Sequence, residues 1–351
     1  MKIILVTPLL DHGGGQRYIT ELANYWSSCN HEVRIILLRS GEPFYSISKN
    51  VKIEALGYSS KNRISRCITG IKTFLKLRNA IRQSNPDFVI SILSTTNILT
   101  LLATSGLGIK IFIRDAMSPF RKRNKFERIL RKLLYKKAAG VITMTQIAKD
   151  IIQKETGVKN IRIIPNPVRI IKDDHQKKEK IILNVGRLIP AKGQFFLLEA
   201  CRLINNKDWK FVILGEGNLR KKLEEQINDL NIKGQVLLPG VEKNIDKWLN
   251  KSSIFVLPSI SEGFPNALLE AMSAGLPVVS FDCKVGPSDI IDDGENGYLV
   301  PEGNVHLLAE KIAFLMENAT LRNSIAEKAK LDSKKYEIGI ISEKILDFCT
   351  N

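Results

Sequence analysis

Short apolar runs alternate with amphipathic stretches along the whole chain. In the first half these runs predict buried parallel strands at residues 2–7, 33–38, 87–93, 110–114 and 140–145. Helical periodicity lies between them, at residues 16–28, 65–83 and 121–138. The second half repeats the rhythm, with strands predicted at residues 180–186, 210–217, 236–240, 254–259 and 277–282. Strand–helix alternation that occurs twice predicts an α/β protein with two doubly wound, Rossmann-like domains.

The pattern is interrupted once, at Pro165 and Pro167 and the polar stretch 172–180 that follows. Two prolines exclude a helix, and the charges suit a solvated linker. We therefore expect a first domain at residues 1–169 and a second at 170–331. Loops at the carboxyl ends of both sheets would then face a common cleft.

Composition agrees with a globular, intracellular protein. The chain is 44% hydrophobic and 25% charged, and its five cysteines contain no CxxC pair, which argues for a reducing compartment and against a zinc or disulfide framework. The first apolar run stops at Pro8, unlike a secretory signal, and no run approaches the ~20 residues that span a bilayer. We expect a cytoplasmic protein.

The net charge of +17 is concentrated in the first half. Residues 1–170 contain 29 Lys and Arg against 10 Asp and Glu, whereas the rest of the chain is close to neutral. This asymmetry predicts an anionic partner for the first domain: a membrane surface, a nucleic acid or a phosphorylated acceptor. The alternative is a genome that favours lysine, but such a bias should enrich both halves equally.

Residues 121–137 have the pattern of a basic amphipathic helix. Nine Lys or Arg surround one apolar stripe, which consists of Phe126, Ile129, Leu130, Leu133 and Leu134. Residues 61–82 add further Lys and Arg. Such helices suit anionic lipid headgroups, and we expect the stripe to dock on the sheet while the charges face the lipid. An ordinary helix with a solvated basic face is the alternative. Nucleic acid is not expected, because aromatic residues are not interleaved with the charges.

The densest chemical signal lies between Ser259 and Asp282 and contains Glu262 and Glu270. Gly263 and Pro265 predict a turn, and residues 266–273 a helix that ends at Gly275. Free N–H groups at the start of that helix would receive a phosphate. The alternative is that Glu262 is a first-turn acid and Glu270 a solvated helix residue.

A second motif, GRLIPAKG, follows the first strand of the second half at residues 186–193. Arg187 and Lys192 are two cations at a strand–helix turn, spaced to converge on one diphosphate. Breaking a glycosidic bond to a nucleotide develops charge on the leaving phosphate, which fixed cations stabilise. No acidic pair or His/Asp cluster suggests a divalent ion, so we expect a site without metal.

These strings, together with EGFP and G-x-PVV, resemble retaining glycosyltransferase family 4, which has the GT-B fold. The resemblance covers essentially the full chain. It implies that Glu262 contacts hydroxyls of the donor sugar, that Glu270 binds the nucleotide ribose, and that Arg187 and Lys192 bind the donor pyrophosphate. We also expect a C-terminal helix at 332–351 that packs back on the first domain.

The donor is expected to touch further residues on both domains. The glycine loop at residues 12–16 reads equally well as a tight turn or as an anion-binding loop, and the resemblance implies that it faces the donor phosphates. Loops at strand ends of the second domain would hold the base. The expected donor-binding set beside Glu270 is Gly14, Gly15, Gly215, Val241, Gly263, Phe264, Asn266, Ala267 and Leu268.

The first-domain partner in catalysis departs from the family pattern. Where the family commonly has a His-Asp or related pair, this chain has Arg114 and Asp115. They are candidates for the acceptor side, and a structural salt bridge is the alternative.

Residues 281–301 resemble a subgroup that extends O-antigen, capsule and lipid-linked glycans, many of whose members use UDP-sugars. Cys283 in this segment reads as a buried small residue.

The expected function is retaining transfer of a hexose or N-acetylhexosamine from a UDP-sugar to a lipid-linked or polysaccharide glycan. The enzyme would be peripheral on the inner face of the cell membrane. Two alternatives stay open. One is a GT-B nucleotide-sugar epimerase, which needs no acceptor. The other is a catalytically inactive basic scaffold that binds membrane or nucleic acid.

Overall fold

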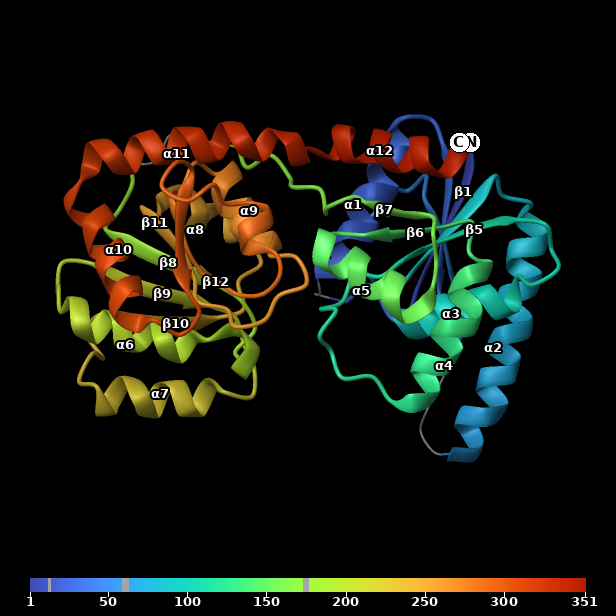
Figure 1. The fold of residues 1–351 in the computed structure, drawn as a ribbon, viewed down its shortest axis with the longest axis horizontal. Coiled ribbons are helices and arrows are strands. Elements are labelled where there is room, and N and C mark those ends of the chain that lie inside the picture. Colours follow the sequence, from blue (N-terminus) through green and yellow to red (C-terminus); the bar gives the residue numbers. More distant parts are fainter. Residues whose placement is uncertain (12–13, 59–62, 173–176) are drawn as a thin grey trace. The chain divides into compact units, whose positions relative to one another are not determined.

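The computed structural model describes residues 1–11, 14–58, 63–172 and 177–351. The chain forms two compact units (Figure 1): Met1–Pro167 with Ile338–Asn351, and Val168–Glu337. The division falls after Pro167, two residues before the expected boundary. Part of the expected linker, residues 173–176, lies outside the described residues, as does Lys61 of the basic stretch at 61–82.

The first unit is built on a parallel sheet, seven-stranded in the described residues, with the order β3-β2-β1-β4-β5-β6-β7. The strands are β1 (Lys2–Thr7), β2 (Glu32–Leu37), β3 (Lys52–Ala55), β4 (Phe88–Ile92), β5 (Lys110–Arg114), β6 (Gly140–Thr143) and β7 (Ile161–Ile163). All of the predicted strands occur. The sequence did not reveal β3 and β7, which are short strands at the two edges of the sheet and have few buried residues.

Helices cover both faces of this sheet (Figure 1). They are α1 (Gly14–Ser28), α2 (Arg63–Ser84), α3 (Ser94–Ala103), α4 (Lys125–Leu134) with the 3₁₀ turn Tyr135–Lys137, α5 (Gln146–Thr156) and α12 (Ile338–Thr350). One core cluster joins α1 and α12 to one face, and another joins α2, α3, α4 and α5 to the opposite face. Helix α1, which follows β1, and helix α3, which follows the neighbouring strand β4, therefore pack on opposite faces of the sheet. This is the switch point at which doubly wound sheets bind ligands.

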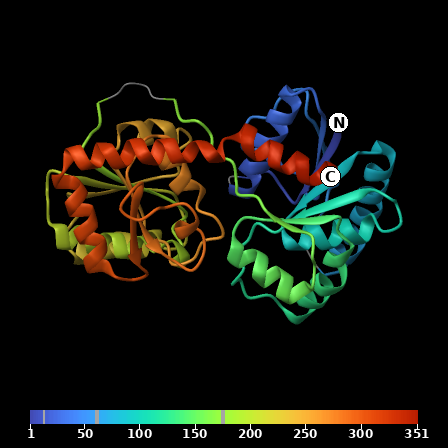
Figure 2. The same ribbon diagram turned by 45° about the horizontal axis from the view of Figure 1, so that its top comes forward.

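The last helix of the chain, α12, belongs to the first unit and packs against α1 (Figure 2). The indole N–H of Trp26 in α1 donates a hydrogen bond to Ser342 Oγ at 2.6 Å. The ring of Phe348 lies 5.4 Å from that of Phe112 in β5 and covers Gly140, where a Cβ would come within 2.5 Å of it. This helix starts at Ile338, so the expected start at residue 332 was wrong: residues 332–337 belong to the second unit.

The second unit repeats the architecture with a parallel sheet, in which the described residues form six strands in the order β10-β9-β8-β11-β12-β13. Its strands are β8 (Ile181–Val185), β9 (Lys210–Leu214), β10 (Val236–Gly240), β11 (Ile254–Leu257), β12 (Val278–Asp282) and β13 (Gly297–Pro301). Its helices are α6 (Gln194–Ile204), α7 (Arg220–Asp229), α8 (Ile245–Lys251), α9 (Asn266–Ser273), α10 (Val305–Glu317) and α11 (Ala319–Ser333). Short 3₁₀ turns lie at Pro190–Lys192, Pro287–Asp289 and Lys334–Tyr336.

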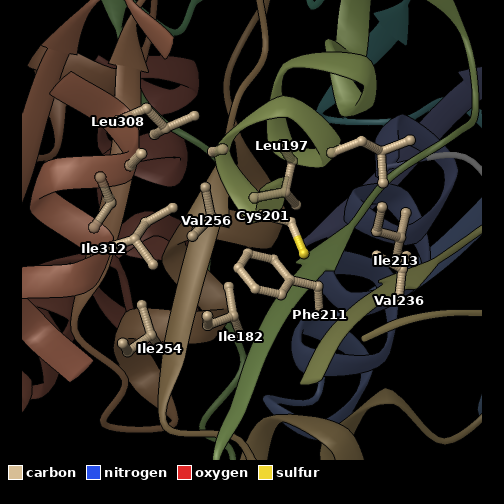
Figure 3. Close-up of a cluster of buried hydrophobic side chains, with 14 of the residues drawn as sticks. Ile182, Leu197, Cys201, Phe211, Ile213, Val236, Ile254, Val256, Leu308 and Ile312 are labelled. Carbon is tan, nitrogen blue, oxygen red and sulfur yellow. The ribbon is translucent and has the colours of Figure 1, made fainter. Parts of the chain in front are cut away.

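One core cluster of the second unit lies between the sheet and the helices α6 and α10. Figure 3 shows Phe211 of β9 and Val256 of β11 among side chains from both helices, including Leu197 and Ile312. All four side chains are fully buried. The packing of α6 and α10 holds the strands in place, so the loops that follow their carboxyl ends have defined positions. Those loops carry the predicted donor motifs.

Candidate active site

The two predicted glutamates lie on either side of the start of helix α9. Glu262 belongs to the loop that follows the buried strand β11, and Glu270 lies inside the helix. Their exposed fractions are only 7% and 8%. The reading of Glu270 as a solvated residue and of Glu262 as a first-turn acid is therefore wrong, since α9 has no acid in its first turn.

The loop of Glu262 is joined to the second motif by backbone contacts. The N–H groups of Ile260 and Ser261 both donate to the carbonyl of Ala191, at 3.0 and 3.3 Å. Gly193 makes this approach possible, because a Cβ on it would lie 2.0 Å from the carbonyl oxygen of Pro258. Its φ of 61° also lies in the left-handed region that favours glycine.

This contact brings Lys192 and Glu262 together. Lys192 Nζ lies 2.6 Å from Glu262 Oε1, a charge-assisted hydrogen bond at the carboxyl edge of the sheet. The sequence predicted both residues in the site but assigned Lys192 to a diphosphate and did not predict this ion pair. An ammonium group has three N–H donors, so two remain for an anion.

Arg187 is exposed, and its guanidinium makes no ion pair or hydrogen bond with any residue that the structure describes. Its backbone is fixed, because the amide of buried Gln194 donates to the Arg187 carbonyl at 3.1 Å. The turn thus holds the main chain of Arg187 in place while its charge stays available to a ligand.

A glycine loop after β9 lies against the Arg187 turn. A Cβ on Gly215, whose φ is 139°, would lie 2.0 Å from the Gly186 carbonyl oxygen, and one on Gly217 would lie 2.3 Å from that of Leu188. The Gly215 N–H donates to Gly240 at 2.7 Å. Of the residues predicted to hold the base, Gly215 is therefore next to the cation motif, and Val241, just after Gly240, is 56% exposed.

The start of α9 leaves fewer free donors than predicted. The Leu268 N–H donates to the Pro265 carbonyl at 3.1 Å, and the Asn266 N–H to that of Phe264 at 3.1 Å. Among the described residues only the Ala267 N–H of this turn lacks an acceptor, and no side chain caps the helix. The prediction of a free donor thus stands for Ala267 and is wrong for Leu268. Gly263 and buried Phe264, whose ring lies 6.2 Å from that of Tyr336, complete the turn.

The segment from Cys283 to Asp289 supports the Glu262 loop, a role that sequence reasoning missed. A Cβ on Gly286, at φ 105°, would lie 2.7 Å from Pro265 and 3.7 Å from the Cβ of Glu262. Burial and the nearby charge of Glu262 raise the pKa of the Cys283 thiol to about 11. Cys283 is thus a buried small residue, as predicted. The Cys-x-x-Gly-Pro string was the available signal.

The first-unit candidates fall in two places. Gly14 and Gly15 begin α1, whereas His12 and Gly13 of the predicted loop lie outside the described residues. A Cβ on Gly15 would meet no described heavy atom within 4 Å, so packing does not require glycine there. This leaves room for the expected close approach of an anion, which stays a prediction.

Arg114 and Asp115, at the end of β5, are both buried. Asp115 forms an ion pair with Arg131 of α4 at 2.5 Å, which is the salt bridge that the alternative reading expected, although with a different partner. Arg114 donates to Asn166 Oδ1 at 2.7 Å and lies 4.1 Å from the centre of the Tyr18 ring. Burial lowers the pKa of Arg114. The acceptor role expected for Arg114 and Asp115 stays a prediction.

The apolar stripe of α4 does not dock as expected. Phe126, Ile129 and Leu133 are 70%, 57% and 62% exposed, whereas Arg131 and Leu134 point into the core. Helix α2 exposes a second row, Ile68, Ile71 and Leu75. Both helices pack on α3. We call these six residues the apolar rows. None of the described helices is long and apolar enough to cross a bilayer.

Metal ligands do not gather in the described part of the chain. No three His, Cys, Asp or Glu side chains of those residues lie close enough together to hold an ion. The expectation of a metal-free site stays a prediction.

Solved structures define the class of this fold. The Anabaena protein Alr3699/HepE, solved in complex with UDP and glucose, superposes on the chain with a TM-score of 0.86. It is 18% identical, and the match covers 99% of this chain and 98% of that one. The fold is therefore GT-B, with two Rossmann-like domains, as predicted.

Sequence comparison then gives the family. Residues 169–332 match Glycosyl transferases group 1, and residues 12–170 match Glycosyltransferase Family 4. A Campylobacter jejuni protein, GalNAc-alpha-(1->4)-GalNAc-alpha-(1->3)-diNAcBac-PP-undecaprenol alpha-1,4-N-acetyl-D-galactosaminyltransferase, is 30% identical over 99% of this chain and 97% of its own. A second from that organism, N-acetylgalactosamine-N,N'-diacetylbacillosaminyl-diphospho-undecaprenol 4-alpha-N-acetylgalactosaminyltransferase, is 28% identical over 93% of each chain. The chain belongs to glycosyltransferase family 4, and it is a glycosyltransferase.

Proposed function

We propose that the enzyme transfers an N-acetylhexosamine from its UDP-sugar to a glycan carried on a polyprenyl diphosphate, with retention of configuration. The observation that carries this proposal is the Lys192–Glu262 pair at 2.6 Å beside the unpaired Arg187. The acceptor class comes from the two Campylobacter relatives, whose names state undecaprenol-linked acceptors and alpha linkages. The nucleotide follows HepE, solved with UDP.

In this proposal the second unit holds the donor. Arg187 and the two remaining donors of Lys192 bind the diphosphate, and the Ala267 N–H supports it at the positive end of α9. The Lys192 ammonium and the Ala267 N–H are held in place before the reaction, and Arg187 adds a cation on a fixed main chain. Together they stabilise the charge that develops on UDP as the glycosidic bond breaks. Glu262 accepts hydrogen bonds from sugar hydroxyls, and Glu270 binds the ribose.

The pairing of Lys192 with Glu262 gives the cation a second task. Because the carboxylate is only 6% exposed and is held by Lys192, it keeps one orientation toward the sugar. Loss of Lys192 would remove a phosphate ligand and also leave a buried carboxylate unpaired, which costs more than loss of an exposed charge. We therefore expect Lys192→Ala to be more damaging than Arg187→Ala.

Product analysis tests this reaction. Purified enzyme would be incubated with UDP-N-acetylgalactosamine and a short glycan on a prenyl diphosphate, and the products separated by mass. We expect an acceptor one N-acetylhexosamine heavier, and kcat lower by about 10²–10³ for Arg187→Ala, Lys192→Ala and Glu262→Gln. An epimerase would instead convert the free UDP-sugar without acceptor. Transfer that survives all three substitutions would disprove the site, and activity in EDTA tests the metal-free mechanism.

We also propose that the first unit binds the cytoplasmic face of an anionic membrane through the apolar rows. Exposed Lys122, Lys125, Lys132 and Lys136 flank the row on α4. The acid of this helix, Glu127, is already paired with Arg121 at 2.5 Å. Exposed apolar side chains surrounded by lysines match the boundary between acyl chains and anionic headgroups.

Vesicle sedimentation tests the membrane proposal. Phe126→Ser with Ile129→Ser should lower binding to phosphatidylglycerol vesicles about tenfold or more, because each apolar side chain contributes roughly 1.5–3 kcal/mol when buried. Leu331→Ser is the matched control, since Leu331 is equally exposed on α11 of the other unit. Equal binding by both variants would exclude the apolar rows as the contact.

A further inference from the structure

Arg220, the first residue of α7, joins the ends of two neighbouring strands in the second unit. Each nitrogen of its guanidinium donates to a different acceptor. Nη1 donates to Glu216 Oε1 at 2.5 Å, and Nη2 donates to the carbonyl of Leu238 at 2.8 Å. Nε donates to Glu224 Oε1, within the same helix, at 2.7 Å. Glu216 lies in the loop between β9 and α7, and Leu238 lies in β10. One side chain therefore holds the exit of β9 and the end of β10 together.

Strand β10 is irregular at the point of this contact. Between Leu237 and Gly240 it has one residue more than the stretch of β9 with which it pairs. An extra residue disrupts the ladder locally and redirects the chain. Pro239 lies in this stretch and has no N–H to donate. The pairing of strands alone therefore leaves this end of β10 poorly fixed, and the bond from Arg220 to the Leu238 carbonyl holds it.

Gly240 lies against the ion pair that Arg220 forms. A Cβ on Gly240, whose φ is 93°, would lie 3.1 Å from Glu216 Oε1 and 3.9 Å from Arg220 Nη1. The Gly240 carbonyl also accepts from the Gly215 N–H at 2.7 Å. The end of β10 is thus held both by the Gly215 loop and by the Glu216–Arg220 pair. We call Arg220, Glu216 and the Leu238 carbonyl the Arg220 clamp.

The residue that follows the clamped strand has free backbone groups. Neither the N–H nor the carbonyl of Val241 has a partner among the described residues. A backbone N–H beside a C=O matches the edge of a uracil, on which an N–H lies next to carbonyl oxygens. The clamp also reaches the cation motif, because the Glu216 carbonyl accepts from the Leu188 N–H, next to Arg187, at 2.9 Å. It therefore fixes groups that can bind a base relative to those proposed to bind the diphosphate.

We propose that Arg220 is a positioning residue for the nucleobase, which acts through the backbone of Gly240 and Val241 and gives the site its preference for uridine. This inference rests on the proposed function, since it assumes that the second unit holds a UDP-sugar. Arginine suits the task because its planar fork reaches several acceptors at once, whereas the ammonium of lysine is a point charge. The side chains of Arg220 and Glu216 are 32% and 48% exposed, and exposed ion pairs contribute little to stability. The effect of Arg220 should therefore appear in nucleotide binding.

Calorimetry on the full-length enzyme with two ligands, UDP and inorganic pyrophosphate, tests the clamp. We expect Arg220→Gln to weaken UDP binding about tenfold, with little change in melting temperature. Pyrophosphate should bind as tightly as before, because Arg187 and Lys192 are unchanged. Arg220→Lys should resemble Arg220→Gln, since one ammonium cannot hold both strand ends. Arg202→Gln is the matched control: Arg202 also pairs with a glutamate of its own helix, α6, at 3.4 Å, and this variant should bind both ligands normally.

The two glutamates around Arg220 separate the clamp from the helix. Glu216→Ala removes a contact of the clamp and should weaken UDP binding several-fold. Glu224→Ala removes only a bond inside α7 and should leave UDP binding unchanged. Cytidine diphosphate is the third ligand, because cytosine reverses the donor and an acceptor on the same edge of the base. The preference for UDP over cytidine diphosphate should fall in Arg220→Gln and Glu216→Ala, whereas a general loss of folding would weaken both nucleotides equally.

Transfer kinetics provide a second measurement. Arg220→Gln should raise the KM for the UDP-sugar about tenfold and lower kcat much less. Wild-type affinity for UDP in Arg220→Gln would overturn the proposal, and so would full recovery in Arg220→Lys, because charge alone would then suffice. Equal weakening of UDP and pyrophosphate would also overturn it, since the whole site would then be disturbed. UDP binding that depends on Arg220 in an enzyme without transfer activity would keep the clamp and reject the proposed function.

Discussion

Single glycines decide where the chemistry of the second unit is placed. Gly193 allows the turn that contains Lys192 to contact the residue just after β11. Gly215 allows the loop after β9 to pass close to the Arg187 turn. Gly286 allows the segment from Cys283 to Asp289 to lie against the Glu262 loop. In each case a Cβ would come within 2.7 Å of another part of the chain. The charged residues carry the reaction, but these close approaches determine the distances between them.

Gly193→Ala should separate Lys192 from Glu262. A methyl group 2.0 Å from the Pro258 oxygen, at a φ of 61°, forces the turn to move. We expect the variant to lose about 2 kcal/mol of stability or more, and kcat to fall by ~10²-fold, because a shift of about 1 Å has such effects on catalysis.

Urea denaturation and the transfer assay measure the two effects. Gly234→Ala is the matched control, since no heavy atom lies within 4 Å of its added Cβ. Wild-type kcat in Gly193→Ala would contradict the assigned role of this turn.

At the scale of elements, a buried ion cluster orients α4. Arg131 is 1% exposed and contacts Asp115 at 2.5 Å and Glu155 of α5 at 3.4 Å, and Arg123 lies 3.7 Å from Glu155. With these cations turned inward, the row that contains Phe126 is left outside. The orientation of the helix therefore depends on charge pairing more than on apolar burial.

Asp115→Asn should destabilise the first unit by about 3 kcal/mol, since it leaves Arg131 buried without its main counter-ion. Replacing both partners, as Asp115→Leu with Arg131→Met, should recover most of this loss, because no buried charge is left unpaired. Thermal denaturation of the three proteins checks the order. A double variant less stable than Asp115→Asn would refute this account of α4.

The same helix shows why sequence predicts some features and not others. Strands such as β1 and β4 were predictable because every parallel strand at the centre of a covered sheet is an apolar run. The stripe at Phe126 was visible too, but periodicity does not reveal which side of a helix faces the core. That depended on Asp115, which is distant in sequence. The Lys192–Glu262 contact was hidden for a similar reason: the motifs named both residues, but their pairing depends on Gly193 meeting Pro258.

For the whole molecule, the first unit is built from two separate stretches of the chain, with the second unit between them in sequence. The second unit is continuous, Val168–Glu337, whereas the first is completed only by the last helix. Phe348 and Ile345 of α12 belong to the core cluster that covers one face of the first sheet. The first unit thus depends on residues from both ends of the chain.

Phe348→Ala should destabilise the first unit selectively, by ~3–5 kcal/mol, as truncation of a buried aromatic side chain does. Hydrogen exchange resolved by peptide should show faster exchange in β1, β5 and α1, with β8 and β11 unchanged. Phe314→Ala is the control, because Phe314 is 43% exposed on α10 and should have a much smaller effect. Equal acceleration in both units would contradict independent cores.

The position of α12 also bears on the order in which the protein matures during translation. Domains usually fold in sequence as they leave the ribosome. Here the nascent first unit emerges with Trp26 and its neighbours on α1 still uncovered, and it stays so while some 170 further residues are made. The middle of the chain is therefore the first part that can finish folding, and the first unit is completed only after α12 has been made. A chain truncated before residue 338 would contain all of the second unit attached to an incomplete first one.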